Sequence, residues 1–165
     1  MIDGPALVVG PVFLCFELGG PPGHKGRHRS RMVFPRGKKP FIQQYPDPAT
    51  AAYEATLKQA AAIFMRGRAP TEAPLALLVH SFRPIPPSWS GKARRAAIAG
   101  DIRPTSRPDW DNYGKITDAL NKIVWLDDAQ VVDGRVIKLY AEHPALRIEV
   151  REFVLASSVV PAVTA

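Results

Sequence analysis

Prolines limit the fold of this chain more than any other feature of its sequence. The 165 residues include 17 prolines, about twice the usual share. Proline fixes φ and lacks a backbone N–H, so a high proline content favours stiff connections between helices and strands. The cluster Gly19-Gly20-Pro21-Pro22-Gly23 also ends any regular element before it. We therefore expect long, stiff connections and a large share of loops.

Hydrophobic patterns between the prolines predict both helices and strands. Residues 49–65 follow Asp47-Pro48, an N-cap and a first-turn proline, and have apolar residues at helical spacing. Shorter helices are expected at 90–99 and 111–123. Strands are expected at 11–18, 73–82, 131–140 and 146–153, with a hairpin turn at Pro35-Arg36-Gly37-Lys38. This predicts one α+β domain over residues 1–155, with a small mixed sheet of about five strands and two or three helices, and a flexible tail at 156–165.

The chain is strongly basic, with 22 lysines and arginines, 15 acids and a formal net charge of +7. Such a charge favours a polyanionic partner, either nucleic acid or an anionic membrane surface. The basic residues gather in two stretches, 24–39 and 83–107, and the first contains no acid. The candidates for phosphate contacts are Lys25, Arg27, Arg29, Arg31, Arg36, Lys38, Lys39, Lys92, Arg94, Arg95 and Arg107.

Cysteine content and hydropathy suggest a compartment. Cys15 is the only cysteine, which excludes a disulfide within the chain and fits a cytosolic protein. The apolar stretch at residues 6–18 is too short to span a bilayer and is interrupted by Pro11 and Glu17. Asp3 stands where a signal peptide would carry positive charge. We expect neither export nor a membrane span.

An acidic island interrupts this basic chain. It consists of Asp109-Trp110-Asp111-Asn112-Tyr113-Gly114-Lys115, then Asp118, then Trp125-Leu126-Asp127-Asp128. Carboxylates repel a bound polyanion unless a divalent cation intervenes. If a helix begins near Asp111, then Asp111, Lys115 and Asp118 project from one face within about 40° of arc. The strand predicted after Asp128 can fold back and return a carboxylate to Asp109 and Asp111.

Carboxylates that converge from two segments suit a hard cation such as Mg²⁺, which prefers oxygen ligands. Such an ion can polarise a phosphate, and a nearby lysine adds positive charge in the transition state. The pattern therefore fits metal-assisted hydrolysis of a phosphodiester.

Two other interpretations compete with this one. A calcium loop also begins D-x-D-N-x-G, but Tyr113 replaces an oxygen ligand and Leu120 stands where a glutamate is needed. A purely structural role would make Asp111 a helix N-cap, Asp109 a turn residue and Lys115 a solvated partner of Asp111. Spacing alone leaves the structural role open.

The motifs together resemble a known family. They are Arg107-Pro108-Asp109-Trp110-Asp111-Asn112, Lys115, Asp118-Ala119-Leu120 and Trp125-Leu126-Asp127-Asp128-Ala129-Gln130-Val131-Val132-Asp133. This pattern resembles the RusA family of Holliday junction resolvases, including phage and prophage members, most strongly from Arg103 to about Lys138. The resemblance implies a RusA-like fold, a homodimer, a four-way DNA junction as partner, and the cytoplasm of a bacterial or phage-infected cell.

The resemblance also implies roles for individual residues. Asp109, Asp111 and Asp128 would be catalytic metal ligands for Mg²⁺, with Mn²⁺ as a substitute, and Lys115 would assist catalysis. Asp127 and Asp118 are candidates for positions outside the direct ligands. The implied activity is metal-dependent, paired hydrolysis of junction strands in DNA recombination and repair. The alternatives are an accessory protein that binds branched DNA without cutting it, and a broader flap or fork nuclease.

Overall fold

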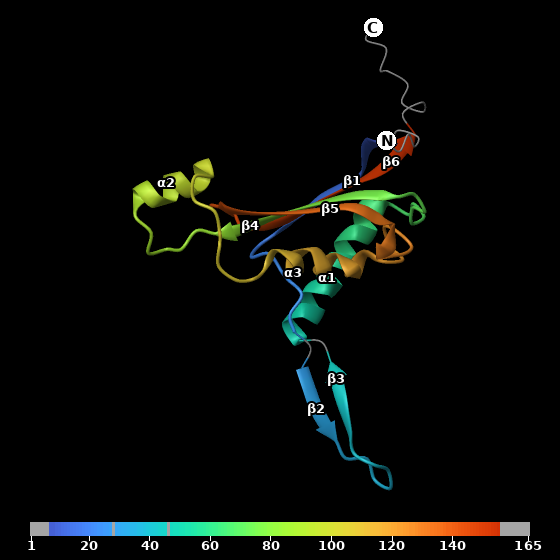
Figure 1. The fold of residues 1–165 in the computed structure, drawn as a ribbon. Helices are drawn as coiled ribbons and strands as arrows, with labels where there is room; N and C mark the ends of the chain where they lie inside the picture. The colour runs from blue at the N-terminus through green and yellow to red at the C-terminus, as the bar shows by residue number, and fades with distance from the viewer. Residues whose placement is uncertain (1–6, 28, 46, 156–165) are drawn as a thin grey trace, which may run out of the picture.

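The chain folds around a four-stranded mixed sheet, seen in a computed structural model that describes residues 7–27, 29–45 and 47–155 (Figure 1). The strand order is β1 (Leu7–Gly19), β6 (Ala145–Leu155), β4 (Leu75–Pro84) and β5 (Val131–Ala141). Strand β6 is antiparallel to both of its neighbours, whereas β4 and β5 are parallel. The predicted α+β class with a mixed sheet is confirmed. The tail expected at 156–165 lies outside the described residues.

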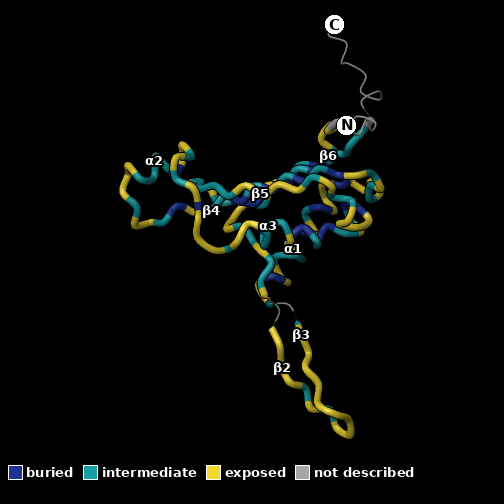
Figure 2. The backbone as a smooth tube through the Cα atoms, viewed as in Figure 1, coloured by how far each residue is buried: buried dark blue, intermediate teal, exposed yellow. Residues whose placement is uncertain are grey.

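Two further strands form a separate hairpin. Strand β2 (Arg29–Val33) pairs antiparallel with β3 (Phe41–Tyr45), and the backbone N–H of Lys38 donates to the carbonyl of Pro35 between them. The predicted turn is therefore present. This hairpin extends away from the main sheet, and almost all of it is exposed (Figures 1 and 2).

Helix α1 (Pro48–Met65) covers one face of the main sheet, and its boundaries follow from local chemistry. The Asp47 carboxylate accepts hydrogen bonds from the backbone N–H groups of Ala49 and Thr50, so it caps the free donors of the first turn. Its buried side chains include Leu57, Ala61 and Met65, which join the core cluster of the strands. The expected helix at 49–65 is thus confirmed.

Helix α2 (Gly91–Ala99) begins after Ser90, whose hydroxyl accepts a hydrogen bond from the backbone N–H of Ala93. It lies at the far end of the sheet from α1, on the long connection between β4 and α3 (Figure 1). No described helix combines the length and the apolar character that crossing a bilayer requires.

The helix expected at 111–123 is wrong in its extent. Helix α3 spans only Trp110–Lys115, and a 3-10 helix, η1 (Ile116–Leu120), continues from it. The Thr117 hydroxyl donates to the carbonyl of Gly114 at 2.6 Å and competes for an acceptor of the α-helical pattern. Two adjacent β-branched residues, Ile116 and Thr117, also favour a helix less than straight side chains do. The chain therefore tightens into a 3-10 turn while keeping Ile116 and Leu120 buried.

The core beneath α3 and η1 centres on Trp125. This side chain is completely buried, and its indole N–H donates to the side-chain oxygen of Asn121 at 2.5 Å. Leu57 of α1, Leu120 of η1 and Val124 are completely buried in the same cluster. Burial of these side chains joins the helix layer to the sheet and so positions the acidic segments that flank them.

We expect Trp125→Ala to lower the free energy of unfolding by about 3–5 kcal/mol, because truncation of a buried aromatic side chain loses burial and leaves a cavity. Chemical denaturation followed by circular dichroism measures the change. Trp110→Ala is the matched control: Trp110 is 62% exposed, and its loss should cost no more than about 0.5 kcal/mol. Equal losses in the two variants would contradict the core role of Trp125.

Candidate functional site

Helix α3 carries the central charged pair of the acidic island. Lys115 Nζ lies 2.7 Å from Asp111 Oδ2, four residues earlier on the same face. The hydrogen bond from Lys115 holds the pKa of Asp111 below its ordinary value, and the same bond raises the pKa of Lys115. The predicted proximity of these two side chains is confirmed. The N-cap position belongs to Asp109, not to Asp111 as the structural interpretation required, and the Asp109 side chain makes no capping hydrogen bond.

Two cations of the sheet fix the segment that leads to Asp109. Lys138 Nζ on β5 donates to the carbonyls of Ser106 (3.0 Å) and Pro108 (2.9 Å). Arg83 Nη1 on β4 donates to the same Ser106 carbonyl at 3.1 Å. Burial, together with the charge of Arg83, lowers the pKa of Lys138, whereas the charge of Asp109 opposes this shift. The strands therefore hold the backbone on which Asp109 is mounted.

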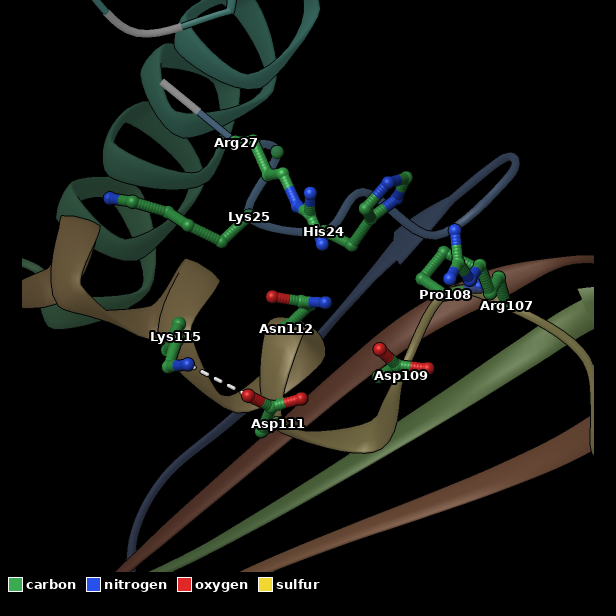
Figure 3. A pocket seen from close by; sticks show the side chains of 10 residues that line it. His24, Lys25, Arg27, Arg107, Pro108, Asp109, Asp111, Asn112 and Lys115 are labelled. Atoms are coloured by element: carbon green, nitrogen blue, oxygen red, sulfur yellow. Dashed lines mark hydrogen bonds and ion pairs between the residues drawn. The ribbon is translucent and has the colours of Figure 1, made fainter.

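A cavity of about 630 Å³ opens between this segment and the basic N-terminal loop. Its lining residues are His24, Lys25, Gly26, Arg27, Arg107, Pro108, Asp109, Asp111, Asn112 and Lys115. The backbone N–H of Lys25 donates to the carbonyl of Asn112 at 2.8 Å and ties the two walls together. Figure 3 shows Asp109 and Asp111 below the basic loop, with the Lys25 side chain turned away from them towards α1. The cavity thus combines carboxylates on one side with cations on the other.

A second cavity, of about 270 Å³, lies against the sheet and is lined by further acids of the island. Asp118 and Asp128 line it together with Asp111 and Lys115, so this ion pair borders both cavities. Burial raises the pKa of Asp118; the charge of Lys25, 3.8 Å away, opposes the rise, and that of Asp128 adds to it. Asp118 therefore lies within the electrostatic influence of both a cation and a second carboxylate.

Of the three expected metal ligands, Asp109 and Asp128 each share a cavity with Asp111, but the three do not converge. Asp109 shares the first cavity with Asp111, whereas Asp128 shares the second. Across the described ranges, no three His, Cys, Asp or Glu side chains are grouped so that they could hold one ion. In the same part of the chain, the carboxylates of Asp109 and Asp128 accept no hydrogen bond, so their oxygen lone pairs are uncommitted. Uncommitted carboxylate oxygens are the type of donor that a hard cation prefers, so the chemistry of these residues fits such an ion.

The paired aspartates Asp127 and Asp128 have different environments. The Asp127 carboxylate accepts a hydrogen bond from the backbone N–H of Ala129 at 2.9 Å and caps the 3-10 turn η2 (Asp128–Gln130). Asp128 instead faces the second cavity. Of these two adjacent acids, Asp127 therefore caps a turn and Asp128 contributes to the site.

Gln130 anchors this loop, and sequence reasoning assigned it no role. Its side-chain oxygen accepts from the backbone N–H groups of Leu126 and Asp127, both at 2.9 Å. Its side-chain nitrogen donates to the carbonyls of Thr71 and Ala73, both at 3.0 Å, just before β4. Gln130 thus connects the Asp128 loop to a segment more than fifty residues earlier, and no local pattern could have indicated the contact. In the same way, nothing in the sequence around Lys138 indicated its contacts with Ser106 and Pro108.

The basic candidates separate into groups that the sequence did not distinguish. Lys25 pairs with Glu54 of α1 at 2.6 Å, and Arg29 pairs with Asp47 at 2.6 Å. Acids from the region of α1 therefore partly neutralise a stretch that contains none itself. The structure brings Lys25, Arg27 and Arg107 to the first cavity. The remaining candidates lie elsewhere: Arg29, Arg31, Arg36, Lys38 and Lys39 on the hairpin and its turn, and Lys92, Arg94 and Arg95 on α2.

Comparison with known proteins identifies the family. A family model described as Endodeoxyribonuclease RusA matches residues 20–151, which include the basic loop and all the acidic motifs. The chain belongs to the RusA family. YqaN, an uncharacterized protein of Bacillus subtilis (strain 168), is 36% identical over 143 residues, which cover 83% of this chain and 94% of that protein. The similarity therefore extends well beyond the acidic island.

We expect Gln130→Ala to lower the free energy of unfolding by about 1–3 kcal/mol, because it removes hydrogen bonds and leaves partly buried backbone groups without partners. Amide hydrogen exchange should accelerate at residues 126–130 before it changes elsewhere. Gln59→Ala, at an exposed position of α1, is the matched control and should change neither measurement. Unaltered exchange in the Gln130 variant would contradict its anchoring role.

Proposed function

We propose that this RusA-family protein is a metal-dependent endonuclease that resolves four-way DNA junctions. The observation that supports this most is the first cavity, whose lining combines Asp109 and Asp111 with the cations Arg27, Arg107 and Lys115. A site for a phosphodiester needs cations to attract the backbone, and carboxylates there become useful only with a divalent ion. Charge of both signs in one cavity therefore favours catalysis over binding alone.

Asp111 is the residue about which we propose that the metal ligands gather. Asp109 lines the first cavity with Asp111, and Asp128 lines the second with it, so together they would supply hard oxygen donors for Mg²⁺ or Mn²⁺. When bound, the ion would supply Lewis-acid polarisation of the scissile phosphate. Asp118 and Asp127 then have supporting positions, the former beside Lys25 and the latter as the cap of η2.

Lys115 is protonated, so it is suited to stabilise a transition state and not to act as a base. Its ordinary pKa is already far above neutrality, and the hydrogen bond to Asp111 raises it further, so the side chain stays protonated at neutral pH. A protonated lysine cannot accept a proton, but it can stabilise the negative charge that builds on the phosphate oxygens. Arg27 and Arg107 line the same cavity and would hold the DNA backbone in place.

Paired cutting of a junction requires two active sites. Each chain carries one Asp111–Lys115 pair, so we propose a homodimer in which the two sites face opposed strands, as the two-fold symmetry of a dimer allows. The biological setting that follows from this reaction is DNA recombination and repair in the cytoplasm of a bacterial or phage-infected cell. An accessory binding protein and a flap or fork nuclease remain as outcomes that the experiments below distinguish.

Asp111→Asn should abolish junction cleavage, with a rate loss of at least about a hundredfold, because loss of a metal ligand removes several kcal/mol of transition-state stabilisation. The measurement is cleavage of a synthetic four-way junction, a fork, a flap and a linear duplex in Mg²⁺ and in Mn²⁺. Asp101→Asn, exposed beyond α2, is the control and should cut normally. Equal cleavage by Asp111→Asn and wild type would refute the metal role, and equal cutting of all four substrates would indicate a broader nuclease.

Lys115→Ala should slow cleavage by about 10²–10³-fold while junction affinity falls much less, since a charge aimed at the developing negative charge acts mainly on the transition state. Single-turnover cleavage and a binding titration without metal separate the two effects. Lys58→Ala, at an exposed position of α1, should leave both unchanged. Proportional losses of binding and cleavage would instead assign Lys115 to DNA binding.

A further inference from the structure

The β2–β3 hairpin presents a cluster of apolar side chains to solvent at its outer end. This apolar tip consists of Met32, Phe34, Phe41 and Ile42. Phe34 is 76% exposed and Phe41 is 51% exposed. The two strands pair with each other in a sheet of their own, and Figure 1 shows them extending away from the body of the protein. The hairpin therefore contributes little to the core, and its conformation leaves large hydrophobic groups in water.

The register of the hairpin places these apolar groups on both of its faces. Met32 is opposite Ile42, and Val33 is opposite Phe41, so successive pairs point to opposite sides of the ribbon. A two-stranded hairpin is marginally stable alone in water. An exposed apolar cluster on such an element indicates a surface that contacts a partner.

Charge identifies the kind of partner. Residues 29–45 contain no aspartate or glutamate, and Arg36, Lys38 and Lys39 occupy the turn directly beside the apolar tip. A nucleic acid suits both features of the tip. Its phosphates can pair with the cations, and its flat bases can stack on the phenylalanines.

The base of the hairpin is anchored beside the candidate active site. The loop before β2 is tied to α3 by the hydrogen bond between Lys25 and Asn112 and to α1 by that between the Gly26 N–H and the Thr50 hydroxyl, at 3.0 Å. After β3, Asp47 caps α1 and also pairs with Arg29. DNA held in the first cavity would therefore lie next to the start of the hairpin.

We propose that the hairpin enters branched DNA at its branch point, where Phe34 and Phe41 stack on bases that lack a stacked neighbour. This inference rests on the proposed function, since it assumes a branched substrate. A two-stranded ribbon fits within a DNA groove, and apolar side chains of such elements wedge between base steps. In an intact duplex the wedge must first unstack two base pairs, whereas a branch point already interrupts stacking. The hairpin is thus a selectivity element for DNA shape, separate from the residues that cut.

The test compares the double variant Phe34→Ala/Phe41→Ala with wild type, in binding to a four-way junction and to a linear duplex of the same sequence. Ca²⁺ replaces Mg²⁺ so that no strand is cut. We expect the dissociation constant for the junction to rise at least about tenfold, within the range of lost base stacking, and that for the duplex to rise less than about twofold. 2-Aminopurine at the branch point should become fluorescent with wild type and not with the variant.

Two further variants make the result interpretable. Ile63→Ala removes a comparable apolar side chain, 72% exposed on α1, and should bind both DNAs as wild type does. Phe34→Trp/Phe41→Trp keeps flat aromatic rings and should restore junction binding. Thermal unfolding of all variants should match wild type, because the tip lies outside the core.

Several outcomes would overturn the inference. Equal losses for junction and duplex would make the tip a general DNA contact, and unchanged junction affinity would exclude it from recognition. Conversion of a dimer to a monomer in sedimentation, with unchanged junction affinity, would show that a second copy covers the tip. Failure of the proposed function gives a different result: wild type would select the junction in Ca²⁺ yet cut no DNA in Mg²⁺ or Mn²⁺.

Discussion

Hydrophobic packing between helix α1, the η1 turn and the main sheet is the interaction on which the rest of this structure depends. Leu57, Leu120 and Trp125 are completely buried where these three layers meet. Two of the acidic motifs lie only a few residues from one of these buried side chains. Asp118 precedes Leu120 and Asp128 follows Trp125, so the packing of apolar side chains determines where the carboxylates stand. The site is thus a consequence of the core and not an independent assembly.

Hydrogen bonds from two side chains to backbone groups then fix the acidic segments more closely than core packing does. Lys138 holds the segment before Asp109, and Gln130 holds the loop that carries Asp128. Both side chains extend from or adjoin β5, the edge strand that lies parallel to β4. The segments that carry Asp109 and Asp128 are therefore both held in place from the same strand, β5. Attachment to a strand suits a metal site, because the geometry of the ligands must be maintained while flexible DNA is bound.

Much of the fold could be predicted because its signals are local. The Asp47-Pro48 start of α1, the Pro35 to Lys38 turn and the strand segments each depend on residues close together in the chain. The pairing of Asp111 with Lys115 follows from helical spacing alone. Prediction was wrong about the extent of the helix after Asp111, where a hydroxyl of Thr117 and burial of Leu120 favour a 3-10 turn. It also missed Gln130, Lys138 and the ion pair of Lys25 with Glu54, whose partners lie some thirty residues or more away.

The sequence by itself determined the chemical character of this protein: a basic chain with one acidic island, whose spacing places Asp111 and Lys115 on one helical face and whose motifs indicate the RusA family. The tertiary structure alone decided which acids share a cavity, which one serves as a cap, and which cations are already neutralised. It also decided that the basic loop continues into a hairpin that stands away from the core. The physical reason is that spacing governs contacts within one turn or strand, whereas contacts between distant segments depend on how the whole core closes.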